Sequence, residues 1–313
     1  MDVLNLLMDT LDSALTYVIS PSKRLFVGYL VTALVLAWCI FRRLGSHTSF
    51  WAYIFDTQIW FGASARGDYK LIAFNLLFKA ILLGQFLMLG FTLADQTSDT
   101  LAAVFGPSAI KLNATTTLAA YTFAITVIGD LSVYWIHRAC HQIPALWAFH
   151  QIHHSAETLT PFTQLRIHPV ELLINNFRSL IVFGLLTGGF AYVSAHPIRP
   201  VEFLGVNIFT FLFFTCGANL RHSHVPLTYG RRLEHLFISP RQHQIHHSIA
   251  PEHHHANYGS KLAVWDWLWG TLIISQAGER LRFGCPGLMR VHTLTTLLFA
   301  PFVRRSPPPE NGT

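Results

Sequence analysis

Histidine is the residue type in this sequence that could carry chemistry: the chain has 18 histidines, more than its 16 aspartates and glutamates together. The hexapeptide His-Gln-Ile-His-His-Ser occurs twice, at residues 150–155 and 243–248. Its histidines are spaced i, i+3 and i+4, which places three imidazoles on one face of a helix. Two identical sets in one chain indicate metal binding, and we expect both to contribute ligands to a shared centre.

A further pair, His137 and His141, is also four residues apart, and Asp130 and Tyr134 precede it on the same helical face. Taken alone, the pair also fits a helix end with interfacial tryptophan, arginine and histidine. A carboxylate near the inner end of an apolar segment is costly unless it has a partner, so we expect Asp130 to accept a hydrogen bond from a ligating imidazole. The pair and the two hexapeptides offer eight imidazoles, whereas a zinc ion takes four ligands. The set therefore predicts two metal ions, and zinc, copper, iron and nickel all suit imidazole.

The composition is that of an integral membrane protein. Of the 313 residues, 51% are hydrophobic and only 12% are charged, which is about half the charged fraction of soluble domains. The net charge of +6 comes from scattered basic residues that form no stripe interleaved with aromatics, so nucleic acid is not an expected partner. The four cysteines lie far apart, which argues against a disulfide framework or a thiolate metal site.

Five apolar segments are long enough to span, or nearly span, a bilayer as helices; they are residues 25–41, 71–93, 112–136, 179–195 and 200–216. We expect four or five spans, the count of four omitting 25–41, and the last two segments should form a helical hairpin. Alternating spans place residues 42–70, 137–178 and 217–313 on one side, with 17 of the 22 basic residues and nearly all of the histidines. The positive-inside rule makes that side the cytoplasm. The predicted fold class is all-α, an integral membrane helical bundle with a cytoplasmic helical cap that holds a histidine-rich di-metal site.

A series of motifs across about residues 120–275 resembles the fatty acid hydroxylase / sterol desaturase superfamily. The series begins with Asp-x-x-x-Tyr-Trp-x-His-Arg-x-x-His at 130–141, the first hexapeptide, and Arg-Ile-His-Pro-Val-Glu at 166–171. It continues with Asn-Leu-Arg-His-Ser-His at 219–224 and with Ser-Pro-Arg-Gln at 239–242, directly before the second hexapeptide. The last motif is Asn-Tyr-Gly-Ser-Lys-Leu at 257–262. Members of this superfamily are membrane-bound, histidine-box di-iron oxygenases that act on lipid C–H bonds.

The resemblance implies that the chain holds two irons, which zinc could replace in the purified protein. The implied ligands are nine histidines: His137, His141, His150, His153, His154, His222, His243, His246 and His247. All of them except His222 are also the predicted catalytic residues. Whether His168, His224 or the run His253, His254 and His255 binds metal stays open, and a solvated loop is expected for that run. Asp266 could orient a ligand, cap a helix or pair with an arginine. His47, His196 and His292 are expected to be dispensable.

The same resemblance implies an oxidoreductase that uses O2 to hydroxylate, or desaturate, a C–H bond of a lipid such as a fatty acyl chain or a sterol. A zinc-dependent membrane lipid hydrolase is the alternative, although it needs only three or four histidines and leaves the repeated hexapeptide unexplained. The sequence has no nucleotide-binding, iron–sulfur or fused haem signature. We therefore expect a separate ferredoxin- or cytochrome-type electron donor with its reductase, docked by basic residues near the second hexapeptide: Arg231, Arg232, Arg241, Arg280 and Arg282.

Three regions are predicted: membrane spans in 1–111, a hydroxylase-like catalytic domain in 112–275, and an amphipathic segment with a disordered tail in 276–313. The protein should be multi-pass, with its active site on the cytoplasmic side. We expect a bacterial inner membrane in preference to the endoplasmic reticulum, because the chain is compact and carries no retention tail.

Overall fold

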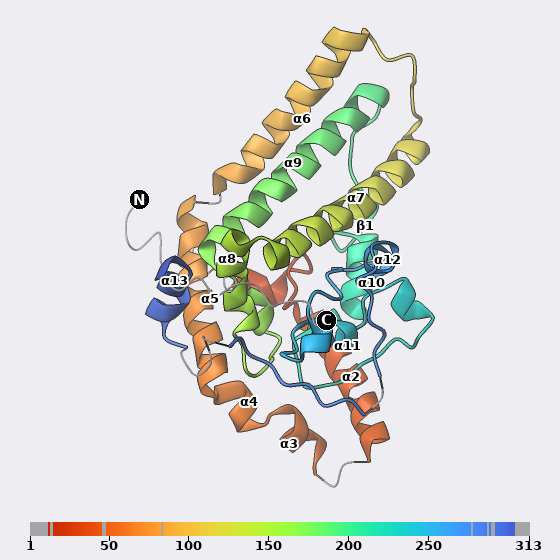
Figure 1. Ribbon diagram of the computed structural model, residues 1–313. Coiled ribbons are helices and arrows are strands. Elements are labelled where there is room, and N and C mark those ends of the chain that lie inside the picture. The colour runs from red at the N-terminus through yellow and green to blue at the C-terminus, as the bar shows by residue number, and fades with distance from the viewer. Residues whose placement is uncertain are drawn as a thin grey trace.

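The computed structural model describes residues 15–45, 48–82, 84–276, 278–286 and 292–303, together with residues 12 and 288. The chain is mostly helical (Figure 1). Its longer helices are α2 (Val27–Leu44), α5 (Ala63–Leu82), α6 (Gly84–Phe105), α7 (Ala114–Gln142), α8 (Pro144–His154), α9 (Pro169–Val193) and α13 (Leu294–Val303). The shorter helices are α3 (Phe50–Ile54), α4 (Thr57–Phe61), α10 (Ile208–Thr215), α11 (Pro240–His246) and α12 (Val264–Leu268). Single 3-10 turns form η1 (Thr163–Leu165), η2 (Ala218–Arg221), η3 (Leu233–His235) and η4 (Pro251–His253), and the one sheet in the described residues pairs β1 (Glu202–Phe203) with β2 (Val206–Asn207).

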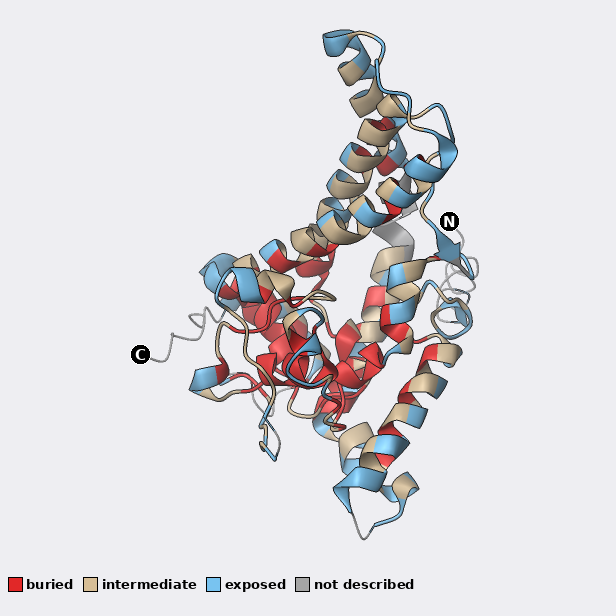
Figure 2. Ribbon diagram, turned by 90° about the vertical axis from the view of Figure 1, so that its right-hand side faces the viewer, coloured by how far each residue is buried: buried red, intermediate tan, exposed pale blue. Residues whose placement is uncertain are grey.

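Helices α6, α7 and α9 form an arm that projects from the rest of the molecule (Figure 1). The start of α7 is set by Asn113, whose side chain accepts a hydrogen bond from the Thr116 amide, and α9 begins with Pro169 at its first position. The arm exposes large apolar side chains such as Phe123 and Ile181, whereas buried residues concentrate in the body below it (Figure 2). Among the described residues, α2, α7 and α9 are long and apolar enough to cross a membrane.

One of the predicted spans is wrong. Residues 71–93 fall within α5 and α6, but residue 83 between these two helices lies outside the described residues, so this span stays a prediction. Residues 200–216 do not form a spanning arm, because Leu204 and Gly205 adopt positive φ values of 51° and 72° and turn the chain back as a β-hairpin. The helix that follows, α10, has 8 residues, and at 1.5 Å per residue it is far shorter than the bilayer core.

Two apolar clusters and one buried ion pair hold the body together. Leu71 of α5 packs with Trp147 and Ile152 of α8 and with Leu297 of α13, while α2 packs against the segment that contains Leu220 and Val225. Between them, a fully buried Arg166 guanidinium contacts Asp68 at 2.8 Å and also donates to the Ile152 carbonyl at 2.8 Å. This pair ties the loop after α8 to α5. The predicted tail beyond residue 303 lies outside the described residues.

Contact between α6 and α9 depends on glycine. A Cβ atom at Gly188 would stand 2.3 Å from the Ala94 carbonyl oxygen and 2.5 Å from the Thr97 Cβ, whereas nothing lies within 4 Å of one at Gly189. We expect Gly188→Ala to force the two helices apart and destabilise the protein by about 1–3 kcal/mol, the usual cost of overpacking. Gly189→Ala is the matched control and should keep or raise the Tm, because alanine is the better helix former. Thermal unfolding in detergent measures both, and equal Tm values for the two variants would contradict the proposed contact.

Candidate metal centre

The structure brings all nine predicted ligand histidines together in two adjacent groups. Within each group the candidate ligand atoms all lie within 4.8 Å of one another. The first group is His137, His141, His150, His154 and His246, and the second group is His153, His222, His243 and His247. All of these residues are buried except His137, which is partly exposed.

Each copy of the repeated hexapeptide contributes to both groups. In α8, His150 and His154 belong to the first group and His153 to the second; in α11, His246 belongs to the first group and His243 to the second. Both helices carry proline at their start, and α11 has a capping box in which Ser239 and Gln242 bond each other's backbone amides. The isoleucine of each copy, Ile152 or Ile245, is fully buried and lies on the helix face opposite the imidazoles. The local sequence pattern therefore determines where each helix begins, which of its faces carries the histidines and which residue is buried on the other face.

The free ring nitrogens of the first group fit a metal ion. The Nε2 atoms of His141, His150, His154 and His246 are buried and have no hydrogen-bond partner. A buried polar atom without a partner is costly unless something else binds it. Four such atoms directed into one small space form a donor set of the type that zinc or iron takes.

The second group fits a metal ion for a different reason. The Nε2 atoms of His222, His243 and His247 stand 3.1–3.2 Å from one another, and that of His153 is 3.3 Å from His222. Each neutral imidazole nitrogen has either one proton or one lone pair, so three nitrogens in a triangle cannot satisfy one another. Nitrogens bound to a common ion at roughly 2.0–2.1 Å would be about 3.0–3.4 Å apart, which matches these separations.

In the first group, three of the opposite ring nitrogens are held by the protein, whereas the buried Nδ1 atoms of His243 and His247 in the second group have no hydrogen-bond partner. The Nδ1 atoms of His137 and His246 donate to the carbonyl oxygens of Tyr258 and Ala256 at 2.8 Å, and His150 Nδ1 donates to Glu171 Oε1 at 2.9 Å. These bonds place the proton on Nδ1 and leave the Nε2 lone pair free for a metal.

Burial favours the neutral form of six imidazoles of the two groups, as metal ligation requires. Burial and the neighbouring His150 lower the pKa of His153 to about 3. Burial is also the largest cause that lowers the pKa of five other members: His154, His222, His243, His246 and His247.

The expectation that Asp130 accepts a hydrogen bond from a ligating imidazole is wrong. Its carboxylate accepts from the backbone amides of Lys261 and Leu262 and from Trp265 Nε1, each at 3.0 Å, because the chain folds the segment after η4 over α7. The carboxylate that does contact a ring is Glu171, in the first turn of α9. Glu171 is the last residue of the motif at 166–171, and this position is the sequence feature that could have identified it as the partner of a histidine. Asp266 acts on a histidine through the backbone. It accepts hydrogen bonds from the Tyr258 and Gly259 amides and so fixes the Tyr258 carbonyl, to which His137 donates.

The remaining histidines lie outside both groups. His168 caps α9 through Nδ1 and donates from Nε2 to the Leu298 carbonyl, and His224 packs against the Tyr53 ring. A solvated loop at 253–255 is only partly correct, because His253 is buried and pairs with Glu279 at 2.8 Å. His292 is buried between Arg166 and Glu157, at 3.0 Å from each, and its dispensability for turnover stays a prediction. His196 is exposed, and His47 lies outside the described residues.

A cavity of about 470 Å³ reaches the centre from one side, and its lining includes members of both groups, His137, His150, His153, His222 and His243. A second, smaller cavity of about 40 Å³ is lined by His141, His154, His246 and His247. Two cavities with different linings therefore reach members of both groups.

Residues 122–271 match the fatty acid hydroxylase family. This match covers 150 of the 313 residues, and through it the chain is similar to that family. The chain is 30% identical over 146 residues to an ornithine lipid hydroxylase of Rhizobium tropici, which covers 46% of this chain and 39% of the relative. It is 29% identical over 184 residues to an alkylglycerol monooxygenase of Xenopus tropicalis (58% and 35%), and 28% identical over 160 residues to a Delta(7)-sterol 5(6)-desaturase of Gibberella zeae (49% and 42%).

The chain thus spans less than half the length of these curated relatives. The matched segment contains every member of the two histidine groups. No solved structure matches the chain.

The contact between Glu171 and His150 generates a prediction about metal affinity. Glu171→Gln preserves the shape but removes the charge that supports the imidazole, so we expect about a 10–100-fold weaker metal affinity. Exposed Glu202→Gln is the control and should bind metal as the parent does. Asp130→Asn should lower the Tm more than the metal affinity, because Asp130 holds a loop instead of a ring. Metal retained during titration with a chelator measures the affinities, and unchanged retention in Glu171→Gln would contradict this role.

Proposed function

We propose that the protein is a membrane-bound di-iron oxygenase that uses O2 and external electrons to hydroxylate, or desaturate, a C–H bond of a lipid. The observation that carries the proposal is the pair of interleaved all-imidazole groups at the wall of one cavity. The names of the matched relatives, a lipid hydroxylase, a monooxygenase and a sterol desaturase, support the same class of reaction. The zinc hydrolase remains the alternative, but one hydrolytic zinc needs three protein ligands and leaves most of this set without a role.

Iron, when bound, would supply the activation of O2 and the oxidation of an alkyl carbon. The nine histidines would hold it. Glu171 and the carbonyls of Ala256 and Tyr258 would keep three rings of the first group in place, and the Arg166 carbonyl would orient His153 of the second group. Buried Trp147 and Ile152 would limit the water that reaches the centre.

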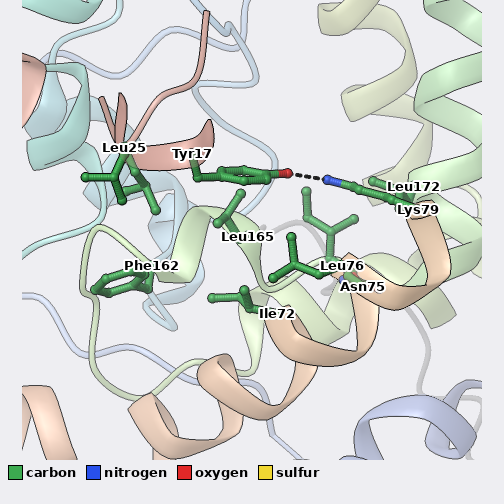
Figure 3. A pocket seen from close by; sticks show the side chains of 11 residues that line it. Tyr17, Leu25, Ile72, Asn75, Leu76, Lys79, Phe162, Leu165 and Leu172 are labelled. Atoms are coloured by element: carbon green, nitrogen blue, oxygen red, sulfur yellow. Dashed lines mark hydrogen bonds between the residues drawn. The ribbon is translucent and has the colours of Figure 1, made fainter. Parts of the chain in front are cut away.

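Two apolar spaces adjoin the metal-facing cavity and would hold the lipid. A groove of about 630 Å³ between α7 and α10 shares Lys261 with the cavity and is lined by exposed aromatic and aliphatic side chains, among them Phe123, Phe209 and Leu212. A slot of about 180 Å³ shares Tyr17, Leu165, Ile167 and Leu172 with the same cavity. Figure 3 shows this slot between α5 and the segment near Tyr17, where Lys79 Nζ donates to the Tyr17 hydroxyl at 2.7 Å.

The proposed topology keeps the histidine centre on the cytoplasmic side of a bacterial inner membrane. The exposed apolar surface of the arm and the spanning length of α2, α7 and α9 support a multi-pass protein. We retain the three regions 1–111, 112–275 and 276–313 as a proposal.

A separate acidic electron carrier would dock on the face near the smaller cavity. Arg231, Arg232, Arg280 and Arg282 are exposed and available to it. Arg241 is not, because it is buried and donates to Gln244 and to the Glu279 carbonyl. Docking through exposed charges should weaken as salt rises.

The proposal is tested by reconstitution in lipid. The chain loaded with ferrous iron should hold about two irons, as two imidazole-rich groups suggest, and should oxidise a lipid over many turnovers only with O2 and a reductase–carrier pair. His243→Ala should abolish turnover, whereas exposed His196→Ala should not. Full activity with zinc alone would favour the hydrolase, and turnover with NADPH but no carrier would show that the chain has its own redox site.

The size of the slot predicts a limit on the length of the acyl chain that is oxidised. Leu76 lines it, whereas neighbouring Leu77 on α5 is exposed. Leu76→Trp should fill the slot, so the longest acyl chain that is oxidised should become shorter, while Leu77→Trp should keep the parent profile. Product analysis over a series of chain lengths measures this. The same profile in both variants would show that the lipid chain lies elsewhere.

A further inference from the structure

The cavity that faces the histidine centre is strongly basic. Five cationic side chains line it: Lys23, Arg24, Arg178, Arg221 and Lys261. Among the described residues that line it, Glu171 is the one carboxylate, and its Oε1 is already bonded to His150. The histidines beside it are neutral ligands, so bound metal ions would add further positive charge that the protein does not balance.

The arginines of this cavity lack carboxylate partners. Arg221 is only 4% exposed; it donates to the Ser260 carbonyl, and its buried Nε has no partner. Arg178 donates to the hydroxyls of Ser132 and Ser179 at 2.8 Å, and its buried Nε is likewise unpaired. In the described part of the chain, neither these two nor Arg24 has a carboxylate oxygen within 4.0 Å.

Nearby groups relieve this charge only in part. Lys261 Nζ lies 3.9 Å from Asp130, but that carboxylate already accepts from two backbone amides and an indole. The Arg221 and Arg24 guanidinium groups lie 5.4 and 5.8 Å from the ring centroids of Phe213 and Phe214, and such cation–π contacts stabilise a cation without neutralising it. A buried arginine with free donors is costly unless an anion binds it, and the fork of a guanidinium suits carboxylate and phosphate oxygens.

The surroundings of the cavity indicate what carries the anion. Its lining continues into the apolar slot on one side through Leu165 and Leu172, and into the apolar groove on the other side at Lys261. An occupant that fits both parts has an anionic group and an apolar chain.

We propose that the protein selects an anionic lipid, whose carboxylate or phosphate group binds Arg178, Arg221 and Lys261 inside the metal-facing cavity. The apolar chain of that lipid lies in the adjoining slot or groove. That this lipid is oxidised rests on the proposed function; that it binds does not.

Equilibrium binding to the metal-loaded protein in neutral detergent tests the proposal. The probes share one acyl chain and differ in the polar group: oleate, oleoyl lysophosphatidate and neutral monooleoylglycerol. The two anionic probes distinguish the carboxylate from the phosphate, and we expect at least one to bind about tenfold or more tightly than the neutral probe, as desolvated charge pairs do. Competition by inorganic phosphate distinguishes a lipid site from a site for a free anion.

Arg178→Gln and Arg221→Gln should each remove about tenfold or more of the preference for an anionic probe, while binding of the neutral probe stays the same. Exposed Arg199→Gln is the matched control and should keep the preference. Metal content is measured for each variant, and Arg178→Gln decides the result if Arg221→Gln, next to His222, loses metal. Equal binding of all three probes, an unchanged preference in Arg178→Gln, or phosphate binding with no preference for the lipids would overturn the proposal.

The binding assay also separates this inference from the proposed function. Selective binding of an anionic lipid without turnover in the presence of iron, O2 and a carrier would leave the anion site in place and remove the oxygenase. Turnover of neutral and anionic lipids at the same rate, unaffected by Arg178→Gln, would support the oxygenase and remove the anion site.

Discussion

Nine imidazoles buried against one another are the constraint on which the rest of the structure depends. Burial removes water from around these rings, so their nitrogens need defined partners, and the protein supplies such partners on the Nδ1 side of His137, His150 and His246. The partners are mostly backbone carbonyls of loops, which have no rigidity of their own. Asp266 and Asp130 fix the loop at 256–262, and the Arg166–Asp68 pair fixes the loop whose carbonyl faces His153. A sequence of buried polar contacts thus extends from the centre to α5 and α7.

The repeated hexapeptide explains why the two groups are inseparable. His153 and His154 are consecutive residues on α8 but belong to different groups, and the same is true of His246 and His247 at the end of α11. Any rotation of either short helix would displace ligands of both groups together. The fully buried isoleucines and the capping box of α11 oppose such rotation, so apolar packing on one face of each helix maintains the geometry of the polar face.

Charge is distributed unevenly around this centre. The arm exposes apolar side chains, Arg231, Arg232, Arg280 and Arg282 are exposed elsewhere in the chain, and the cavity beside the centre holds cations with few counter-charges. A neutral ligand set beside cationic walls has a high positive potential, which would be offset by a bound anion.

The sequence alone determined the features that depend on local spacing. Helical spacing identified eight of the nine histidines that gather in the structure, because residues on one helical face stay neighbours in any fold that keeps the helix. The ninth, His222, was implied by the family resemblance. Whether those residues bind metal stays a prediction. Hydropathy identified α2, α7 and α9 as apolar helices of spanning length, but residues 200–216 contain a two-residue turn at Leu204 and Gly205 that a count of apolar residues does not register.

Only the tertiary structure decided contacts between distant segments. Glu171 bonds His150 from 21 residues away, and Asp130 bonds amides 131 and 132 residues away in place of an imidazole. Arg241 and His292 proved to be buried, and Arg221 and Arg178 proved to face one cavity. No periodicity encodes such contacts, because they arise when helices and loops close around a common core. The spacing of residues along the chain therefore specified the candidate ligands, and the packing of the chain specified their partners.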